Sequence, residues 1–259
     1  MSKPIEIFRC KDKKENYYTK RGNLFDLPMR VLCIGKSQFS GKSSFLLNIL
    51  GQEDKRLYKD DFEGDNIYIF SGSLKSDTKI KNLINQFDIP PENLNDGYDE
   101  DLLEAIFDLT EENYNEDMEE GSKPKNTLII LDDVSFSGSL KSKSNGIINK
   151  IFCNGRHINL SIIATAQKYS QLHTTQRENA TGIVLWSCSD KQLDLIADDH
   201  NTLESGKKQF KKMFRTATEK PYSFMIVNYS NPRDSLYMNM NFQPIGPCGK
   251  VKGQGCDCK

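Results

Sequence analysis

The sequence lacks the features of a membrane-spanning, secreted or strongly cationic protein. None of its apolar runs approaches the about 18 residues that cross a bilayer, so we expect no membrane span. Residues 1–10 contain no apolar segment of the kind that directs secretion. The net charge is -1 at pH 7, which excludes a global basic field that attracts nucleic acid. Any contact with DNA must therefore come from a local patch.

The chain also lacks a regular cysteine pattern and is poor in apolar residues overall. Its seven cysteines are an odd number, and Cys33 and Cys153 lie in apolar stretches, as reduced, buried thiols of a cytosolic protein do. The spacing of Cys248, Cys256 and Cys258 matches no zinc-ligand pattern, which favours a flexible tail over a metal site. The mean hydropathy of -0.61 confines the core to separate segments. At 259 residues, the length suits one large α/β domain or two small ones.

The first informative stretch, residues 30–44, reads RVLCIGKSQFSGKSS. A short strand, a loop of small residues, Gly-Lys-Ser and an apolar helix together resemble a phosphate-binding loop, whose backbone N–H groups converge on a polyphosphate. Lys42 would then reach the terminal phosphates, and the Ser43 hydroxyl would bind Mg²⁺. Position 36 is Lys where glycine is usual, so a serine-rich turn is the alternative. The residues expected to bind nucleotide are Gly35, Ser37, Ser40, Gly41, Lys42, Ser43 and Ser44.

Strands and helices alternate along the rest of the chain. This order predicts an α/β fold with a mainly parallel sheet and helices on both faces, and with ligands at the carboxyl ends of the strands. Residues 127–131 are apolar throughout, as in a strand that is covered on both faces. Expected strands are 31–34, 66–70, 127–131, 160–164, 182–186, 223–227 and 236–240, and expected helices are 42–51, 77–87, part of 96–120, 147–155, 191–200 and 206–216.

Four further polar residues lie next to the expected strands. Asp132 and Asp133 follow the most apolar strand, where one carboxylate can hold Mg²⁺ and the other can deprotonate the attacking water. Gln167 ends the next strand, where its amide can contact both the γ-phosphate and that water. Arg156 precedes the same strand and can serve as an arginine finger for a neighbouring subunit. We expect all four at the same sheet edge as the phosphate loop; a turn, a loop amide and a surface charge are the alternative roles.

The order of these motifs resembles a known family. A phosphate loop, then LIILDD, then GRHINLSIIATAQ, is similar to the FtsK–HerA superfamily of DNA-pumping ATPases, and most similar to the poxvirus-type genome-packaging ATPases of large DNA viruses and virophages. FSGS after the strand at 66–70, and Arg177-Glu-Asn ahead of the strand at 182–186, also fit. The resemblance covers residues 28–190.

The resemblance implies a P-loop NTPase fold of the RecA/FtsK type and a ring of five or six copies around double-stranded DNA. ATP binds between subunits with Mg²⁺ on Ser43 and Asp132, Asp133 is the catalytic acid, and Gln167 is a sensor. Arg156 acts on the neighbouring subunit, with Arg177 as the second candidate for that role. The family also implies DNA translocation into a viral capsid, with the capsid or its portal vertex as partner, in the host-cell cytoplasm at viral assembly sites or in the virion.

We accordingly expect an N-terminal arm at 1–27, an ATPase domain at 28–242 and a flexible Gly/Cys/Lys tail at 243–259. DNA contacts are expected from the loop 135–145, with Lys141 and Lys143, or from the basic helix near 207–215; plain solvation is the alternative for both. The acidic stretch 96–120 is a solvated face or a guard against misplaced DNA. The competing functions are a HerA-like cellular translocase and a non-hydrolysing nucleotide-binding switch.

Overall fold

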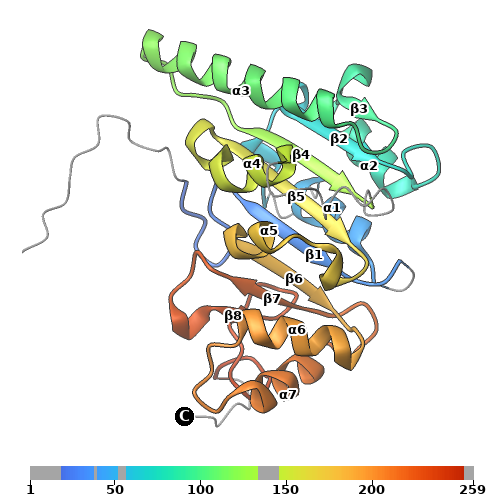
Figure 1. Ribbon diagram of the computed structural model, residues 1–259, viewed down its shortest axis with the longest axis vertical. Coiled ribbons are helices and arrows are strands. Elements are labelled where there is room, and N and C mark those ends of the chain that lie inside the picture. Colours follow the sequence, from blue (N-terminus) through green and yellow to red (C-terminus); the bar gives the residue numbers. More distant parts are fainter. Residues whose placement is uncertain (1–18, 38–39, 52–56, 134–145, 254–259) are drawn as a thin grey trace, which may run out of the picture.

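The computed structural model describes residues 19–37, 40–51, 57–133 and 146–253, and these form an eight-stranded sheet in the order β3-β2-β4-β5-β1-β6-β7-β8 (Figure 1). In this order, each strand from β3 to β6 is parallel to its neighbour. In contrast, β7 is antiparallel to β6, and β8 is antiparallel to β7. The predicted mainly parallel sheet is confirmed. The strands are β1 (Arg30–Ile34), β2 (Ile67–Ser71), β3 (Leu94–Asn95), β4 (Thr127–Asp132), β5 (Leu160–Ala166), β6 (Gly182–Trp186), β7 (Phe224–Asn228) and β8 (Tyr237–Met238).

Helices cover both faces of this sheet, as the sequence predicted. Successive residues of a buried strand point to opposite faces, so β1 sends Leu32 into one core cluster and Val31 into the other. The cluster on one face includes residues of α1 and α2, and the cluster on the other includes residues of α3, α4, α6 and α7. The helices are α1 (Lys42–Gly51), α2 (Thr78–Phe87), α3 (Glu100–Glu120), α4 (Ile147–Asn154), α5 (Thr174–Asn179), α6 (Asp190–His200) and α7 (Lys207–Ala217).

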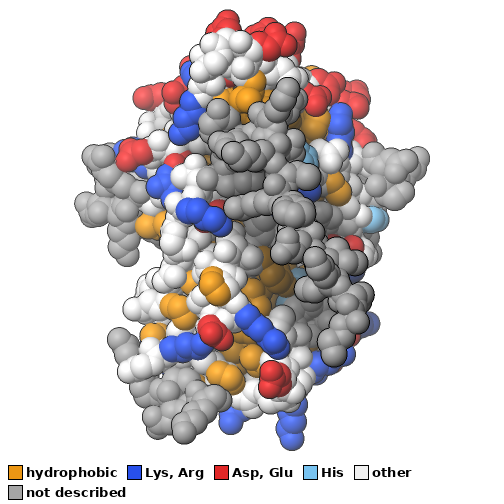
Figure 2. All heavy atoms as spheres, turned by 90° about the vertical axis from the view of Figure 1, so that its left-hand side faces the viewer, with side chains coloured by type: hydrophobic (Ala, Val, Ile, Leu, Met, Phe, Trp, Pro, Cys, Tyr) orange, Lys and Arg blue, Asp and Glu red, His pale blue; other side chains and the backbone are white. Residues whose placement is uncertain are grey.

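The acidic stretch forms one long helix, where the sequence predicted a helix over only part of it. The Asp99 side chain accepts a hydrogen bond from the Leu102 backbone N–H and caps the start of α3. Gly121 ends the helix with φ 74°, a left-handed conformation that glycine adopts without steric cost. Figure 2 shows red carboxylate side chains gathered at the end of the molecule that carries α3. This supports the solvated face; the guard against DNA stays a prediction.

The described parts of the predicted arm and tail pack against the domain. Phe25 and Leu27 are fully buried, and Thr19 and Leu27 exchange two backbone hydrogen bonds of 3.0 Å. Ile245 is buried too, and it pairs with Val251 in an antiparallel bridge. The core therefore begins before residue 28 and continues past residue 242.

The sequence favoured a flexible tail over a zinc site at the tail cysteines, and it predicted no membrane span. Of the tail cysteines, Cys248 is half-buried, and Cys256 and Cys258 lie outside the described residues. In the described ranges, no group of three His, Cys, Asp or Glu side chains is placed to share a metal ion. Within the same ranges, no helix combines the length and the apolar character needed to cross a membrane.

Candidate functional site

The phosphate loop joins β1 to α1 at the carboxyl edge of the sheet. Gly35 has no room for a side chain, because a Cβ there would lie 2.8 Å from the Ser40 Cβ and 3.1 Å from the Trp186 Cβ. Gly41 has φ 84°, a conformation suited to glycine. Lys36 is not among the residues with positive φ, and its carbonyl accepts a hydrogen bond of 2.6 Å from the Ser40 hydroxyl. The close approach that needs glycine thus occurs at position 35, which explains how Lys36 is accommodated.

Lys42 is buried beneath this loop. Its Nζ donates to the carbonyl oxygens of Gly35 at 2.7 Å and Lys36 at 3.1 Å. Burial lowers the pKa of Lys42, and the nearby Asp133 and Asp132 partly oppose that shift. Lys42 is also the first residue of α1, so the unpaired N–H groups of the helix N-terminus lie beside its charge. Together these groups form a cation-lined cradle for an anion.

The acid pair ends β4, two strands away from β1. Asp132 is 3% exposed, and its two carboxylate oxygens accept hydrogen bonds from the hydroxyls of Ser71 at 3.2 Å and Thr165 at 3.1 Å. Burial raises the pKa of Asp132, and the two hydroxyl donors oppose the rise. The Thr165 hydroxyl also accepts from the backbone N–H of Asp133 at 2.8 Å. One threonine therefore positions both acids.

Gln167 is linked to the second acid. Its Nε2 donates to the Asp133 carboxylate at 3.0 Å, across the gap between the ends of β5 and β4. Asp133 has φ 52°, a left-handed conformation that Asp tolerates better than bulkier residues. Because the amide donor and the backbone bond to Thr165 hold Asp133 from two sides, its carboxylate has a defined direction.

A polar cavity of about 560 Å³ brings the phosphate loop and the acid pair together. Two predicted site residues contact the lining of this cavity and are not part of it. The Gly35 carbonyl accepts a hydrogen bond from Lys42, and the Gln167 amide donates one to Asp133. The sequence assigned no role to Ser71, Ser73 or Thr165, although the motifs FSGS and GRHINLSIIATAQ contain them. It did not indicate Tyr222 or the lining from 76 to 79, because these residues belong to no motif. The lining residues are Ser37, Ser40, Gly41, Lys42, Ser43, Ser44, Ser73, Ser76, Asp77, Thr78, Lys79, Asp132, Asp133 and Tyr222.

The donor set of this cavity fits Mg²⁺. Asp132 and Ser43 both line it, and both offer the oxygen ligands that Mg²⁺ prefers. Each carboxylate oxygen of Asp132 accepts one neutral hydroxyl, which leaves further lone pairs for a cation. A site with only one or two carboxylates is usual for Mg²⁺ that is shared with substrate phosphates.

The structure corrects the position of Arg156. This residue lies in a 3₁₀ turn, Gly155–Ile158, that precedes β5, so it lies at the amino edge of the sheet and not at the edge of the phosphate loop. The reason is strand direction: in parallel strands, a residue before a strand and a residue after it lie at opposite edges. Arg156 is exposed, and its Nε contacts the His157 Nε2 at 3.2 Å.

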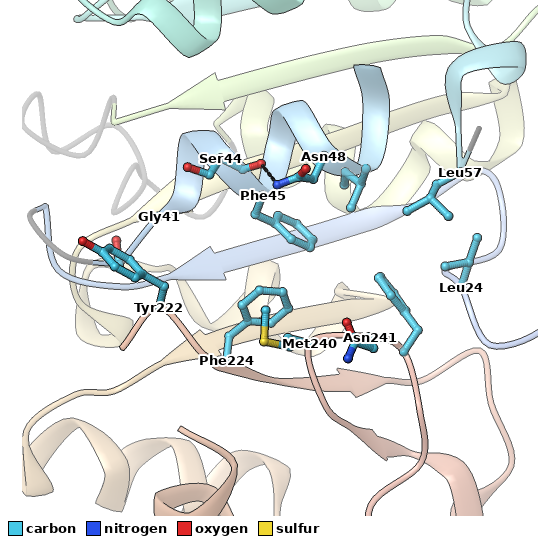
Figure 3. A pocket seen from close by; sticks show the side chains of 13 residues that line it. Leu24, Gly41, Ser44, Phe45, Asn48, Leu57, Tyr222, Phe224, Met240 and Asn241 are labelled. Atoms are coloured by element: carbon cyan, nitrogen blue, oxygen red, sulfur yellow. Dashed lines mark hydrogen bonds between the residues drawn. The ribbon is translucent and has the colours of Figure 1, made fainter. Parts of the chain in front are cut away.

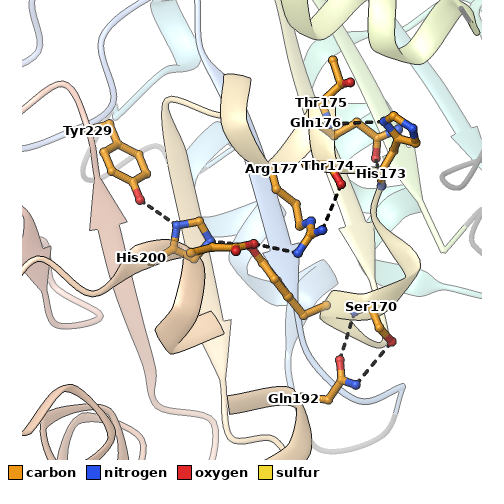
Figure 4. Close-up of polar contacts among 11 residues, drawn as sticks. Ser170, His173, Thr174, Thr175, Gln176, Arg177, Gln192, His200 and Tyr229 are labelled. Carbon is orange, nitrogen blue, oxygen red and sulfur yellow. Dashed lines mark hydrogen bonds and ion pairs between the residues drawn. The ribbon is translucent and has the colours of Figure 1, made fainter. Parts of the chain in front are cut away.

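Arg177 is held by contacts within its own chain. Its guanidinium donates to the Asp199 carboxylate at 2.6 Å and lies 4.9 Å above the centre of the Tyr169 ring. The Tyr169 hydroxyl contacts Asp199 at 2.6 Å and the His200 Nε2 at 2.7 Å, and the His200 Nδ1 contacts the Tyr229 hydroxyl at 2.6 Å. These five residues, here called the His200 network, join α5, α6 and the segments after β5 and β7. Arg177, His200 and Tyr229 are labelled in Figure 4.

Three of the five basic side chains of the predicted DNA-contacting helix pair with acidic residues of its neighbour. In α7, Lys207 pairs with Asp198 and Lys211 with Asp194, both on α6. Arg215 of α7 pairs at 2.7 Å with Asp190, which is also on α6. The other predicted contact, loop 135–145 with its two lysines, lies outside the described residues.

A mainly parallel sheet, a phosphate loop between β1 and α1, and a buried Asp at the end of β4 define the P-loop NTPase fold. Residues 16–241 match the family model described as Poxvirus A32 protein, and the chain belongs to that family. A relative from monkeypox virus, the DNA packaging protein OPG160, is 30% identical over 203 residues, which are 77% of this chain. The chain spans 58% of the length of that relative.

Solved structures give the same fold. The genome packaging NTPase B204 of Sulfolobus turreted icosahedral virus 2, in complex with AMP, is 17% identical with a TM-score of 0.54; the match covers 82% of this chain and 96% of B204. The pCW3 conjugation coupling protein TcpA, with ATPγS, is 14% identical with a TM-score of 0.52, covering 77% of this chain and 57% of TcpA. The fold and the family resemblance predicted from the motif order are thereby confirmed.

Proposed function

We propose that this chain is an ATP-hydrolysing motor that moves double-stranded DNA into a viral capsid. The observation that carries the proposal is the shared polar cavity, in which Lys42, Ser43 and the acid pair face one another. Membership of the poxvirus A32 family, and a relative whose name is DNA packaging protein, support the packaging role. The host-cell cytoplasm at viral assembly sites, or the virion, is the setting that this role requires.

The residues of the cavity have separable tasks in hydrolysis. The N-terminus of α1 and Lys42 bind the triphosphate and offset its charge. Ser43 and Asp132 would hold Mg²⁺, which when bound would offset the charge of the triphosphate. Asp133 accepts a proton from water as the water oxygen bonds to the γ-phosphorus and the bond from that phosphorus to the ADP oxygen breaks. Gln167 and Thr165 keep the Asp133 carboxylate oriented during this step.

The position of Arg156 suits action on a neighbouring subunit. It is exposed at the amino edge of the sheet, whereas its own triphosphate cradle lies at the carboxyl edge. In a closed ring each subunit presents one surface to a different surface of the next. A ring of five or six copies around DNA would therefore place Arg156 at the γ-phosphate of its neighbour. Loop 135–145, which follows the acid pair, is the proposed DNA contact.

Two measurements test this function. ATP hydrolysis should rise when double-stranded DNA is added, and the stimulated activity should elute with a ring-sized species on size exclusion. A nucleotide-binding switch, the main competing function, would bind ATP in the same cavity with no DNA-stimulated turnover. A HerA-like cellular translocase would share the stimulation but would show no dependence on a viral capsid or portal vertex, which an in vitro packaging assay measures.

Mixed rings test the trans role of Arg156. Adding Arg156→Ala subunits to wild type should lower the ATPase rate by more than their fraction, because each variant subunit disables the site of its neighbour. A strictly proportional loss would show that the subunits act independently.

A further inference from the structure

A second cavity, of about 380 Å³, opens beside the phosphate loop (Figure 3). We call it the aromatic hollow. Its walls come from α1 on one side and from β7 and the segment after β8 on the other. It shares Ser40, Gly41, Ser44 and Tyr222 with the polar cavity, so the two cavities meet at the start of α1. The residues that line it are Leu24, Ser40, Gly41, Ser44, Phe45, Asn48, Ile49, Leu57, Tyr222, Phe224, Met240, Asn241 and Phe242.

The walls of the hollow are apolar and aromatic. In Figure 3, Phe45 from α1 points toward Phe224 and Met240 from the opposite wall. The Phe45 and Phe224 rings pack edge to face with centroids 5.3 Å apart. The side-chain amides of Asn48 and Asn241 add polar groups to this lining. An apolar cavity of this size with a few polar groups is typical of a site for a small organic molecule.

Two aromatic residues of the hollow have strained backbones. Five residues other than glycine have positive φ in the described ranges, and three of them are Asp or Asn, which tolerate it. The other two are Tyr222, with φ 63°, and Phe242, with φ 56°, and both line the hollow. Bulky residues in this conformation cost stability and cluster where a ligand is gripped.

Tyr222 is also unusually exposed. Its surface is 58% accessible, the largest value among the exposed large hydrophobic residues described. It lies next to Gly41 at the junction of the two cavities (Figure 3). Its ring is accessible and lies beside the phosphate cradle, so it is placed to stack on a planar ligand.

We propose that the aromatic hollow binds the base of the nucleotide and that Tyr222 stacks on it. This rests on the proposed function, because it requires a triphosphate in the adjoining polar cavity. With its phosphates in the polar cavity, a nucleotide would place its ribose near Ser44, where the cavities join. Its base would then lie in the hollow, between α1 and β7. Stacking accepts any base, whereas the amide of Asn241 can hydrogen-bond to the edge of a purine. Tyr222 is thus a base-binding residue outside the motifs of the phosphate loop.

The test compares ligands that do and do not carry a base. Affinities for ATP and for inorganic tripolyphosphate, each with Mg²⁺, are measured by calorimetry on the full chain. Tyr222→Ala should weaken ATP binding about tenfold, as the loss of a base stack does, and should leave tripolyphosphate binding unchanged. Tyr222→Phe keeps the ring and should bind ATP like wild type. Leu109→Ala, an exposed apolar residue on α3, is the matched surface control.

A second variant guards against a folding defect. Tyr222→Gly removes the ring but accepts the positive φ without strain, so it should match Tyr222→Ala in ATP affinity and fold at least as well. Unchanged ATP affinity in both variants, or equal losses for ATP and tripolyphosphate, would overturn the base site. Loss of the ring-sized species with normal ATP affinity would instead assign the hollow to a subunit contact. If wild type binds neither ligand, the proposed function itself fails.

Discussion

The polar cavity and the His200 network differ in the partners of their buried charged groups. In the network, Arg177 pairs with Asp199, and Tyr169, His200 and Tyr229 bond to one another in a chain. In the cavity, charged groups have only neutral partners: Lys42 donates to carbonyls of its own loop, and Asp132 accepts from two hydroxyls.

The difference separates a ligand site from a structural cluster. Buried charges with neutral partners cost folding free energy, and a charged ligand such as Mg²⁺ with a triphosphate relieves that cost. A network whose charged groups pair with one another offers a ligand little and instead joins α5, α6 and the segments after β5 and β7. Changes in the cavity should therefore remove activity without loss of stability, and changes in the network should do the reverse.

The largest expected effect belongs to Asp133. Asp133→Asn removes the proton acceptor, so turnover should fall by about 100-fold or more, while the amide keeps its size and ATP still binds. Steady-state hydrolysis and ATP titration measure the two properties. The thermal midpoint should stay near that of wild type. Hydrolysis near the wild-type rate would remove Asp133 from the catalytic role.

Lys42→Met should abolish measurable ATP binding at concentrations that saturate wild type. Because burial lowers the pKa of Lys42, its charge is costly in the folded chain, and a Met of similar length should not lower the free energy of unfolding. Denaturant titration without nucleotide measures this. A clear loss of stability would show that Lys42 is a structural cation, which would weaken the contrast with the network.

The network should make stability depend on pH. Burial lowers the pKa of His200 to about 4, from 6.5. The unfolded chain therefore binds a proton between these values that the folded chain does not, so stability falls as pH falls from about 6.5 to 4. The whole shift corresponds to about 3 kcal/mol at most.

The hydrogen-bond pattern agrees with a neutral His200. Tyr169 gives its one proton to Asp199, so its oxygen accepts from the His200 Nε2, and the His200 Nδ1 accepts from Tyr229. Denaturant unfolding of wild type and His200→Gln, each at pH 7, 6, 5 and 4, isolates this contribution, since other groups titrate in both proteins. Identical pH slopes would mean that His200 is accessible to protons in the folded chain.

Particular residues show what the sequence could supply. Gly41-Lys42-Ser43 and the acid pair are local patterns tied to apolar strands, so their place at the carboxyl edge followed from strand order alone. The same logic, applied to Arg156, shows that a residue before a parallel strand belongs at the other edge. The roles of Thr165 and Ser71 could not be found, although both lie in quoted motifs, because these roles depend on the register between β2, β4 and β5. Tyr222 depends on a contact between β7 and α1, distant segments with no shared motif.

The smallest expected effect is the one that separates the two arginines. Arg177→Ala leaves Asp199 without its cation, and losing such a charged hydrogen bond costs about 1–2 kcal/mol of stability because the pair is only partly buried. In rings mixed with wild type, Arg177→Ala should lower the ATPase rate by no more than its fraction, unlike Arg156→Ala, because its guanidinium is already engaged within the chain. Unfolding by urea and the mixing curve are measured on the same preparations. A more than proportional loss with Arg177→Ala would mean that this arginine leaves Asp199 and Tyr169 to reach the next subunit, and the network would then belong to the catalytic cycle.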